Sequence, residues 1–286
     1  MTVPKRRARR EKLGRHVLIN GDAMTVLRRM KAASIDVIVT SPPYNIGLPY
    51  NSYKDAMADA DYLDWMMRIC QQLKRVLRPE GSFFLNISGT SRRPWLPFEL
   101  AMKLQPLFSL QNHIIWVKSL AIGDVTHGHF KPLNSTRFLN HNHEHVFHFT
   151  HEGAVVIDRL AIGVPFKDKS NIARRNHARD IRCRGNTWYI PYETVRTKRQ
   201  KFMHPGTFPV GLPGDCLALH GVDEKSIVLD PFLGSGSTLV AAEEAGANGI
   251  GIELDPTYFR TARARLRAVM PIGEGEMHIH DGIFIV

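Results

Sequence analysis

The stretch IDVIVTSPPY, residues 35–44, joins a strand to an abrupt corner. Its apolar, β-branched first half is typical of a buried strand, and two prolines that cannot donate a backbone hydrogen bond end it. Ligands of open α/β sheets bind at the carboxyl ends of strands. The corner suits a flat ring that carries an amine, because Ser41 and a prolyl carbonyl can accept its N–H bonds while Tyr44 stacks on its face. An ordinary Pro-Pro turn is the alternative at this point.

The composition is that of a soluble globular protein with a basic surface. The chain has 286 residues, which suit one large domain or one domain with a sizeable insertion. Its formal net charge of +11 indicates a polyanionic partner, although ribosomal and membrane-surface proteins share this property. No apolar run has the length of a membrane span, and the basic N-terminus precedes no apolar signal segment. We therefore expect an intracellular protein that makes no membrane contact.

The cysteine and histidine patterns do not indicate a metal site. Cys70, Cys183 and Cys216 form no C-x-x-C pair, so neither a zinc knuckle nor a disulfide framework is expected. Histidines gather between His141 and His148, and their alternation places several of them on one strand face. Because no carboxylate or cysteine pattern completes the set, we expect no metal there.

Alternating patterns along the chain predict a doubly wound α/β fold. Strands are expected at 16–20, 35–39, 82–87, 112–118, 143–149, 226–229 and 249–252, and helices at 22–30, 59–77, 97–107, 208–220, 239–245 and from 256 onward. Asp22 suits either the cap of the first helix or a ligand contact at a strand end. The polar segment 45–61 is a candidate lid over the corner. The tail 277–286 is a candidate edge strand.

Two segments carry an excess of positive charge. Residues 1–15 are a basic arm, either solvated or in contact with phosphates. Residues 159–201 are strongly basic and follow no clear hydrophobic period, which indicates an inserted nucleic-acid-binding segment. Its candidate DNA contacts are Arg174, Arg175, Arg179, Arg182, Arg184, Arg196, Lys198 and Arg199.

A second chemical element lies between residues 226 and 253. A strand ends in the turn Asp230, Pro231, Phe232, Leu233, Gly234, Ser235, Gly236, Ser237 and Thr238, and a helix and a strand ending at Glu253 follow. The glycines let the backbone approach a ligand, and the helix start offers free N–H groups. Glu253 can accept both hydroxyls of a ribose. No lysine precedes Ser237 as in a P-loop, so a nucleoside without a pyrophosphate fits better.

Together these elements resemble the β-class DNA amino-methyltransferases. Residues 40–44 match the catalytic motif of that family, residues 230–236 match its S-adenosylmethionine motif, and Glu253 matches its ribose-binding acid. Residues 204–209 resemble the segment that lines the methionine end of the cofactor, through Thr207 and Phe208. Trp116-Val117-Lys118 and His143-Glu144 resemble strand landmarks of the family. Many relatives have lysine where this chain has Phe208, which puts that contact in doubt. The resemblance omits residues 1–15, most of 120–200 and the tail.

The resemblance implies a Rossmann-like, doubly wound sheet of seven strands, mostly parallel with one antiparallel strand, in circularly permuted order. It divides the chain into a basic arm (1–15), a catalytic half (16–150), a target-recognition insertion (151–202, with a start as early as 120), a cofactor-binding half (203–270) and a C-terminal tail (271–286). The implied cofactor is S-adenosyl-L-methionine and the implied partner is double-stranded DNA. Such enzymes also occur with a cognate restriction endonuclease or as homodimers, in the prokaryotic cytoplasm, but no sequence feature establishes either partner.

The implied reaction is methyl transfer to the exocyclic amine of a flipped-out base. Ser41, Pro42, Pro43 and Tyr44 form its catalytic corner. The three cysteines lie outside these motifs, which argues against C5-cytosine methylation, because that reaction needs a thiolate nucleophile. In the family, Ser at the first position of the corner mostly accompanies N4-cytosine specificity and Asp mostly accompanies N6-adenine. We therefore expect an N4-cytosine enzyme, with an N6-adenine enzyme of the same class as the alternative. A catalytically silent DNA-binding protein on this scaffold is the alternative from another class.

Overall fold

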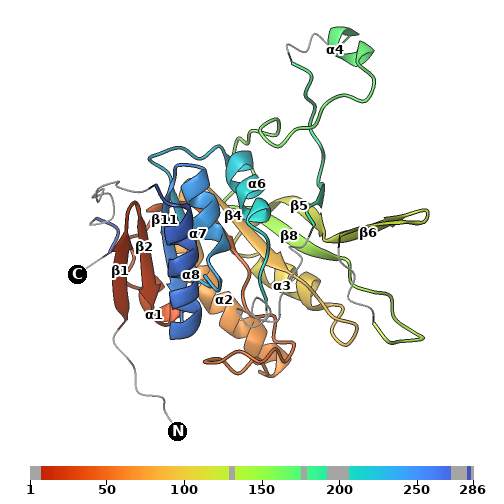
Figure 1. Cartoon of the computed structure of the whole chain (residues 1–286). Coiled ribbons are helices and arrows are strands. Elements are labelled where there is room, and N and C mark those ends of the chain that lie inside the picture. The colour runs from red at the N-terminus through yellow and green to blue at the C-terminus, as the bar shows by residue number, and fades with distance from the viewer. Residues whose placement is uncertain (1–7, 129–132, 175–178, 192–205, 272–281, 285–286) are drawn as a thin grey trace.

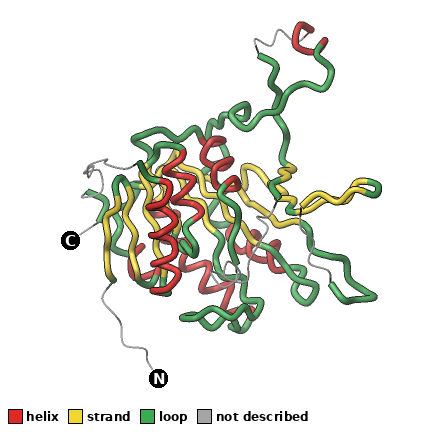
Figure 2. The backbone as a smooth tube through the Cα atoms, viewed as in Figure 1, coloured by secondary structure: helices red, strands yellow, loops and turns green. Residues whose placement is uncertain are grey.

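The computed structural model describes residues 8–128, 133–174, 179–191, 206–271 and 282–284. Its strands are β1 (Arg9–Leu13), β2 (His16–Asn20), β3 (Ile35–Thr40), β4 (Leu77–Ile87), β5 (Ser109–Val117), β6 (Ser119–Ile122), β7 (Val125–Gly128), β8 (His143–Thr150), β9 (Thr187–Tyr189), β10 (Ile227–Asp230) and β11 (Asn248–Glu253). Its helices are α1 (Ala23–Leu27), α2 (Asp59–Val76), α3 (Leu96–Leu104), α4 (Ser170–Arg174), α6 (Gly211–His220), α7 (Ser237–Glu244) and α8 (Pro256–Val269). Figures 1 and 2 show their arrangement.

The main sheet has nine strands in the order β1-β2-β11-β10-β3-β4-β8-β5-β9. The five neighbouring strands β2, β11, β10, β3 and β4 pair in parallel. Strand β8 lies antiparallel between β4 and β5. This part is the predicted seven-stranded, mostly parallel sheet with one antiparallel strand, and β1 and β9 extend it at its two sides. The last strands of the chain, β10 and β11, lie between β2 and β3, which confirms the permuted order.

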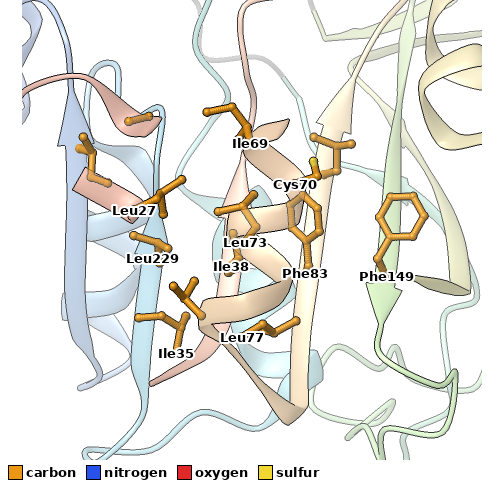
Figure 3. Close-up of a cluster of buried hydrophobic side chains, with 14 of the residues drawn as sticks. Leu27, Ile35, Ile38, Ile69, Cys70, Leu73, Leu77, Phe83, Phe149 and Leu229 are labelled. Atoms are coloured by element: carbon orange, nitrogen blue, oxygen red, sulfur yellow. The ribbon is translucent and has the colours of Figure 1, made fainter. Parts of the chain in front are cut away.

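Helices cover both faces of the sheet. One face packs against α1, α2 and α3, and the other packs against α6, α7 and α8. Figure 3 shows the first of these layers, where Ile69 and Leu73 of α2 meet Ile38, Phe83 and Leu229 of the sheet. All five side chains are buried, and burial of each such side chain contributes roughly 1.5–3 kcal/mol. Within the described ranges, no helix is long and apolar enough to cross a membrane.

Three of the differences from the sequence-based expectation concern the strands of the main sheet and the C-terminal tail. Residues 9–13 of the expected basic arm form strand β1, which pairs with β2 and so occupies an edge that would otherwise stay open. Strand β4 begins at Leu77, directly after α2, and its pairing with β3 skips from Leu77 to Ser82, so that the irregularity accommodates Pro79. Of the expected C-terminal strand, Phe284 makes one isolated bridge to Met30, and 277–281 and 285–286 lie outside the described residues.

Candidate functional site

The two predicted motifs meet at one edge of the sheet, which we call the carboxyl edge because β2, β3, β4, β10 and β11 end there. Strands β3 and β10 are parallel neighbours. At their ends the Thr40 hydroxyl donates to Asp230 Oδ1 at 2.6 Å, and the Thr238 hydroxyl donates to Oδ2 at 2.7 Å. Burial raises the pKa of Asp230 to about 6, against the opposing hydrogen bonds from the two threonines. The corner and the glycine turn are therefore joined directly through buried side chains.

Beyond Thr40, a hydrogen-bonded set that we call the Tyr44 network surrounds the corner. Ser41 Oγ and the Tyr44 hydroxyl oxygen lie 2.7 Å apart, and the Tyr44 hydroxyl donates to Glu144 Oε2 at 2.9 Å. Asn86 Nδ2 of β4 donates to the Tyr44 oxygen at 2.8 Å and to Glu144 Oε2 at 2.7 Å. Lys118 Nζ, just beyond β5, donates to Glu144 Oε1 at 2.9 Å. Strands β4 and β8 and the corner thus hold one tyrosine, and Lys118 at the end of β5 holds Glu144 in place.

Asn86, Lys118 and Glu144 were not among the site residues predicted from the sequence. Lys118 and Glu144 entered only as strand landmarks, and nothing marked Asn86. The signal available was their position: each lies at or just beyond a predicted strand end. Since β4, β8 and β5 are neighbours, these ends converge on Tyr44. Burial, followed by the negative charge of Glu144, raises the pKa of Tyr44 well above its ordinary value, so the phenol stays neutral.

Helix α2 and the loop that follows the corner hold the backbone of the corner in place. The Tyr62 hydroxyl of α2 donates to the Pro43 carbonyl at 2.8 Å, and Pro42 is buried. The candidate lid folds around Asp55, which accepts backbone N–H bonds from Asn45, Ile46 and Leu48. Farther along, the Ser52 hydroxyl donates to Asp255 Oδ2 at 2.5 Å. The loop therefore spans from the corner to the start of α8.

On the cofactor side, Glu253 ends β11 with its carboxyl group almost buried. Oε2 accepts the Gly234 N–H and Oε1 accepts the Asp255 N–H, both at 2.8 Å. Burial raises the pKa of Glu253 to about 7, and these two bonds oppose the rise. Asp22 lies at the same edge, since β2 pairs with β11 and the Gly21 N–H donates to the Glu253 carbonyl. Asp22 caps α1 by accepting the Thr25 N–H at 2.8 Å.

The glycine turn is held by its own hydroxyl groups. Gly234 and Gly236 have positive φ angles of 53° and 90°, which glycine adopts without strain. Arg265 donates to the carbonyl and hydroxyl oxygens of Ser235. The Ser237 hydroxyl donates to the Phe208 carbonyl at 2.8 Å, which places the Thr207–Phe208 segment against the turn. After the buried Pro231, the Phe232 ring packs on Trp65, with centroids 5.5 Å apart.

The described part of the basic insertion starts at the edge of the sheet far from Tyr44 and returns to the carboxyl edge in β9, which pairs with residues 115–117 at the end of β5. It leaves β8 after Thr150, which pairs with Ser109 at the start of β5, and Asp158 bonds to Leu219 at the end of α6. These contacts lie at the edge of the sheet opposite the carboxyl edge. In Figure 1 the segment that carries α4 is at the top and the loop before α2 is at the bottom.

The candidate DNA contacts are accordingly distributed away from the corner or outside the described residues. Arg179 and Arg182 are exposed near the opposite edge, and Arg182 pairs through its backbone with Val164. Arg184 forms an ion pair with Asp215 at 2.5 Å and lies 4.6 Å above the Trp188 ring. Arg174 ends α4. Arg175, Arg196, Lys198 and Arg199 lie outside the described residues.

A different segment, residues 119–142, leaves from and returns to the carboxyl edge. The Lys118 N–H donates to the Asn142 carbonyl at 2.7 Å. Between them the β6–β7 hairpin projects from the body (Figure 1). Gly128 closes its base with φ +80°, where an added Cβ would lie 2.5 Å from the Lys118 carbonyl oxygen. The hairpin is therefore anchored at a residue of the Tyr44 network.

Within the histidine-rich segment 141–148, His145 and His148 pack inside the sheet layer, whereas His141 and His143 are exposed. His145 Nδ1 lies 3.0 Å from His113 Nε2, and their rings stack. His148 contacts Ser82 and Asn112, and burial lowers its pKa to about 3. Across the part of the chain that the structure describes, no three His, Cys, Asp or Glu side chains are grouped as a metal site would require.

A sequence model of the family described as DNA methylase, named for N6 and N4 methyltransferases, matches residues 35–264. The chain belongs to this family. It is 26% identical over 252 residues to the DNA adenine methyltransferase YhdJ of Escherichia coli strain K12, an alignment that covers 87% of this chain and 82% of the relative. It is 28% identical over 250 residues to the type II methyltransferase M.HpaI of Haemophilus parainfluenzae, covering 87% of this chain and 73% of the relative.

Solved structures of DNA methyltransferases share the fold. The cytosine-N4-specific PvuII DNA methyltransferase matches with a TM-score of 0.66 and 19% identity, over 87% of this chain and 86% of that one. A putative DNA modification methylase from Thermus thermophilus, solved in complex with S-adenosyl-L-methionine, matches with a TM-score of 0.60 and 22% identity, over 92% of this chain and 97% of that one. The predicted α/β methyltransferase architecture is thereby confirmed.

Proposed function

We propose that this DNA methylase transfers a methyl group from S-adenosylmethionine to the N4 amine of a flipped-out cytosine. The cofactor supplies a methyl group on a positively charged sulfur, already activated for transfer. Glu253 fits its ribose, because each carboxyl oxygen accepts one backbone N–H and retains capacity for a hydroxyl donor. The backbone of Gly234–Gly236 would border the nucleoside, with Asp22 beside the ribose and Thr207 and Phe208 toward the methionine end. The likeness to a fold solved with this cofactor supports the assignment.

The corner would hold the target base and prepare its amine. An exocyclic amine is a weak nucleophile because its lone pair is delocalised into the ring. Hydrogen bonds from the amine to Ser41 and to the Pro42 carbonyl favour a tetrahedral nitrogen with its lone pair directed at the methyl group. Stacking on Tyr44 would offset part of the cost of flipping, a few kcal/mol. Alignment of the two reactants would supply much of the rate.

The choice of cytosine rests on one side chain, the hydroxyl of Ser41. A neutral hydroxyl suits the cytosine amine, and the cytosine-N4-specific structural relative agrees with it. Adenine is the second candidate, because the chain resembles an adenine methyltransferase. Duplex DNA methylated with labelled S-adenosylmethionine, digested to nucleosides and separated, distinguishes the two. We expect N4-methylcytosine; a peak of N6-methyladenine alone would reverse the choice, and no incorporation into mixed-sequence DNA would reject the enzyme.

We also propose that the duplex approaches the carboxyl edge and contacts residues 119–142. A flipped base must reach Ser41, and this segment begins and ends beside the Tyr44 network. Of the 151–202 insertion, residues near Asp158 lie at the other edge, whereas β9 runs beside the end of β5 to the carboxyl edge, where it can border the same duplex. A cognate restriction endonuclease is proposed from the similarity to a type II methyltransferase alone. A homodimer and a prokaryotic cytoplasmic location stay predictions.

A further inference from the structure

The Tyr44 network has a defined proton direction. Tyr44 carries a single hydroxyl proton, which it donates to Glu144 Oε2 at 2.9 Å, since an ionised carboxylate only accepts. The Nδ2 group of Asn86 only donates, and it also points at the Tyr44 oxygen, at 2.8 Å. The remaining contact, Ser41 Oγ at 2.7 Å, must therefore donate to Tyr44. Asn86 Nδ2 approaches Ser41 Oγ only at 3.4 Å, so Ser41 keeps a lone pair that can accept an N–H bond from the target amine.

The hydrogen bonds therefore run, donor to acceptor, from the target amine through Ser41 and Tyr44 to the carboxylate of Glu144. We propose that Glu144 is the final acceptor of the proton that the amine loses during methyl transfer, and that the proton reaches it through Ser41 and Tyr44. The inference rests on the proposed amino-methyltransferase function. It assigns a chemical role to a carboxylate three hydrogen bonds away from the reacting nitrogen, where the corner itself offers only neutral groups.

The step balances in atoms and charge. The amine nitrogen forms a bond to the methyl carbon, while the carbon–sulfur bond breaks and its electron pair stays on sulfur. The nitrogen gives a proton to Ser41 Oγ, Ser41 gives its own proton to the Tyr44 oxygen, and Tyr44 gives its proton to Glu144 Oε2. The positive charge that the sulfonium loses is matched by the neutralised carboxylate. Water can remove the proton after the products leave.

The surroundings of Glu144 suit this role. Its side chain is 12% exposed and that of Lys118 is 19% exposed, so both lie largely away from solvent. Lys118 bonds to Oε1, which leaves Oε2 facing Tyr44 and Asn86. Asn86 is 3% exposed and bonds to both Tyr44 and Glu144, so it fixes their separation. The raised pKa of Tyr44 keeps the phenol neutral, as a relay requires.

The test compares proton acceptance with mere support of Tyr44. Glu144→Gln keeps the shape and an acceptor oxygen for Tyr44 but cannot take up a proton. We expect single-turnover methyl transfer to slow by about 100-fold, the usual range for loss of a general base, with S-adenosylmethionine and DNA affinities within about threefold of wild type. Tyr44→Phe keeps the stacking ring and breaks the relay, so adding it to Glu144→Gln should cost little more. Glu99→Gln, an exposed carboxylate on α3, is the matched control.

Chemical rescue separates the two roles. In Glu144→Ala, added formate should restore transfer by about tenfold or more, whereas formamide, similar in size but unable to act as a base, should not. A rate for Glu144→Gln within about threefold of wild type, or equal rescue by formate and formamide, would overturn the relay. Wild-type protein that methylates no DNA would instead reject the proposed function, so the two failures are distinguishable.

Discussion

The buried carboxyl group of Glu253 is expected to make the cofactor-free protein less stable as pH rises toward neutrality. Burial raises the pKa of this group from 4.5 to about 7 in the folded chain. Between these two pH values the folded state holds a proton that the unfolded state has released. Because the folded state binds more protons, the free energy of unfolding falls as pH rises through this window. The contribution is fully present below pH 4.5 and is lost as pH passes about 7.

The size of the effect follows from the two pKa values. Each unit of pKa is equivalent to about 1.4 kcal/mol. The rise from 4.5 to about 7 therefore corresponds to a loss of about 3 kcal/mol across the window. The pKa of Asp230, raised to about 6, makes the unfolding free energy fall with pH in the same direction, in any variant that retains Asp230. Glu253→Gln removes only the titration of residue 253. The difference between wild type and this variant in the slope of unfolding free energy against pH therefore gives the contribution of Glu253.

Urea denaturation of cofactor-free protein, from about pH 5 to about pH 8, measures this difference. Wild type should lose up to about 3 kcal/mol more unfolding free energy across the range than Glu253→Gln does. Glu244→Gln, an exposed carboxylate on α7, should follow wild type. Parallel slopes for wild type and Glu253→Gln would refute the reasoning, because they would mean that burial does not hold the proton on Glu253.

The same titration predicts the opposite trend for cofactor binding. The ribose hydroxyls are donors and need the ionised carboxylate of Glu253. Below pH 7, affinity for S-adenosylmethionine should therefore rise by up to about tenfold per pH unit, and it should level off above that pH. Calorimetric titration at several pH values measures it. A flat profile through neutrality would argue against Glu253 as the ribose acceptor.

Three further predictions concern the corner, the strand junction and the hairpin. Ser41→Ala should abolish methyl transfer, measured with labelled cofactor, while cofactor affinity stays within about threefold of wild type, because the hydroxyl acts on the base. Thr40→Val removes a buried donor from Asp230 and should lower the unfolding free energy by about 1–3 kcal/mol in urea titrations; an unchanged midpoint would contradict the role of that bond. Replacing residues 121–126 by a tight two-residue turn should weaken DNA binding in a mobility-shift assay, whereas Arg182→Ala should leave it near wild type; the reverse order would return the DNA contacts to the basic insertion.

The strand ends were predictable from sequence because local chemistry marks them. The β-branched run before Thr40 and the prolines after Ser41 define the end of β3 without any partner. The turn from Asp230 to Gly236 is equally local. Strand β10 is buried throughout and β3 is buried except at Asp36, and buried parallel strands are near-continuous apolar runs. The shared edge then follows from the fold, as the bond between Thr40 and Asp230 confirms.

The side chains behind Tyr44 were not predictable in the same way. Asn86, Lys118 and Glu144 come from three different strands, and their meeting depends on β8 lying between β4 and β5. No residue near them in sequence indicates that neighbour relation. The edge of the sheet from which the basic insertion leaves was not predictable for a related reason. A count of charge measures attraction to DNA but carries no information on which edge of the sheet a segment leaves, and that depends on the antiparallel direction of β8.

The strand order also has a consequence for co-translational folding. Strands β2 and β3 emerge early, yet each pairs with a strand made near the end of the chain, β11 and β10. The nascent chain must therefore carry two unpaired strand edges through most of its synthesis, a state prone to aggregation. A stalled chain that ends near residue 220 should stay sensitive to protease, and resistance should arise only once residues 248–253 have left the exit tunnel.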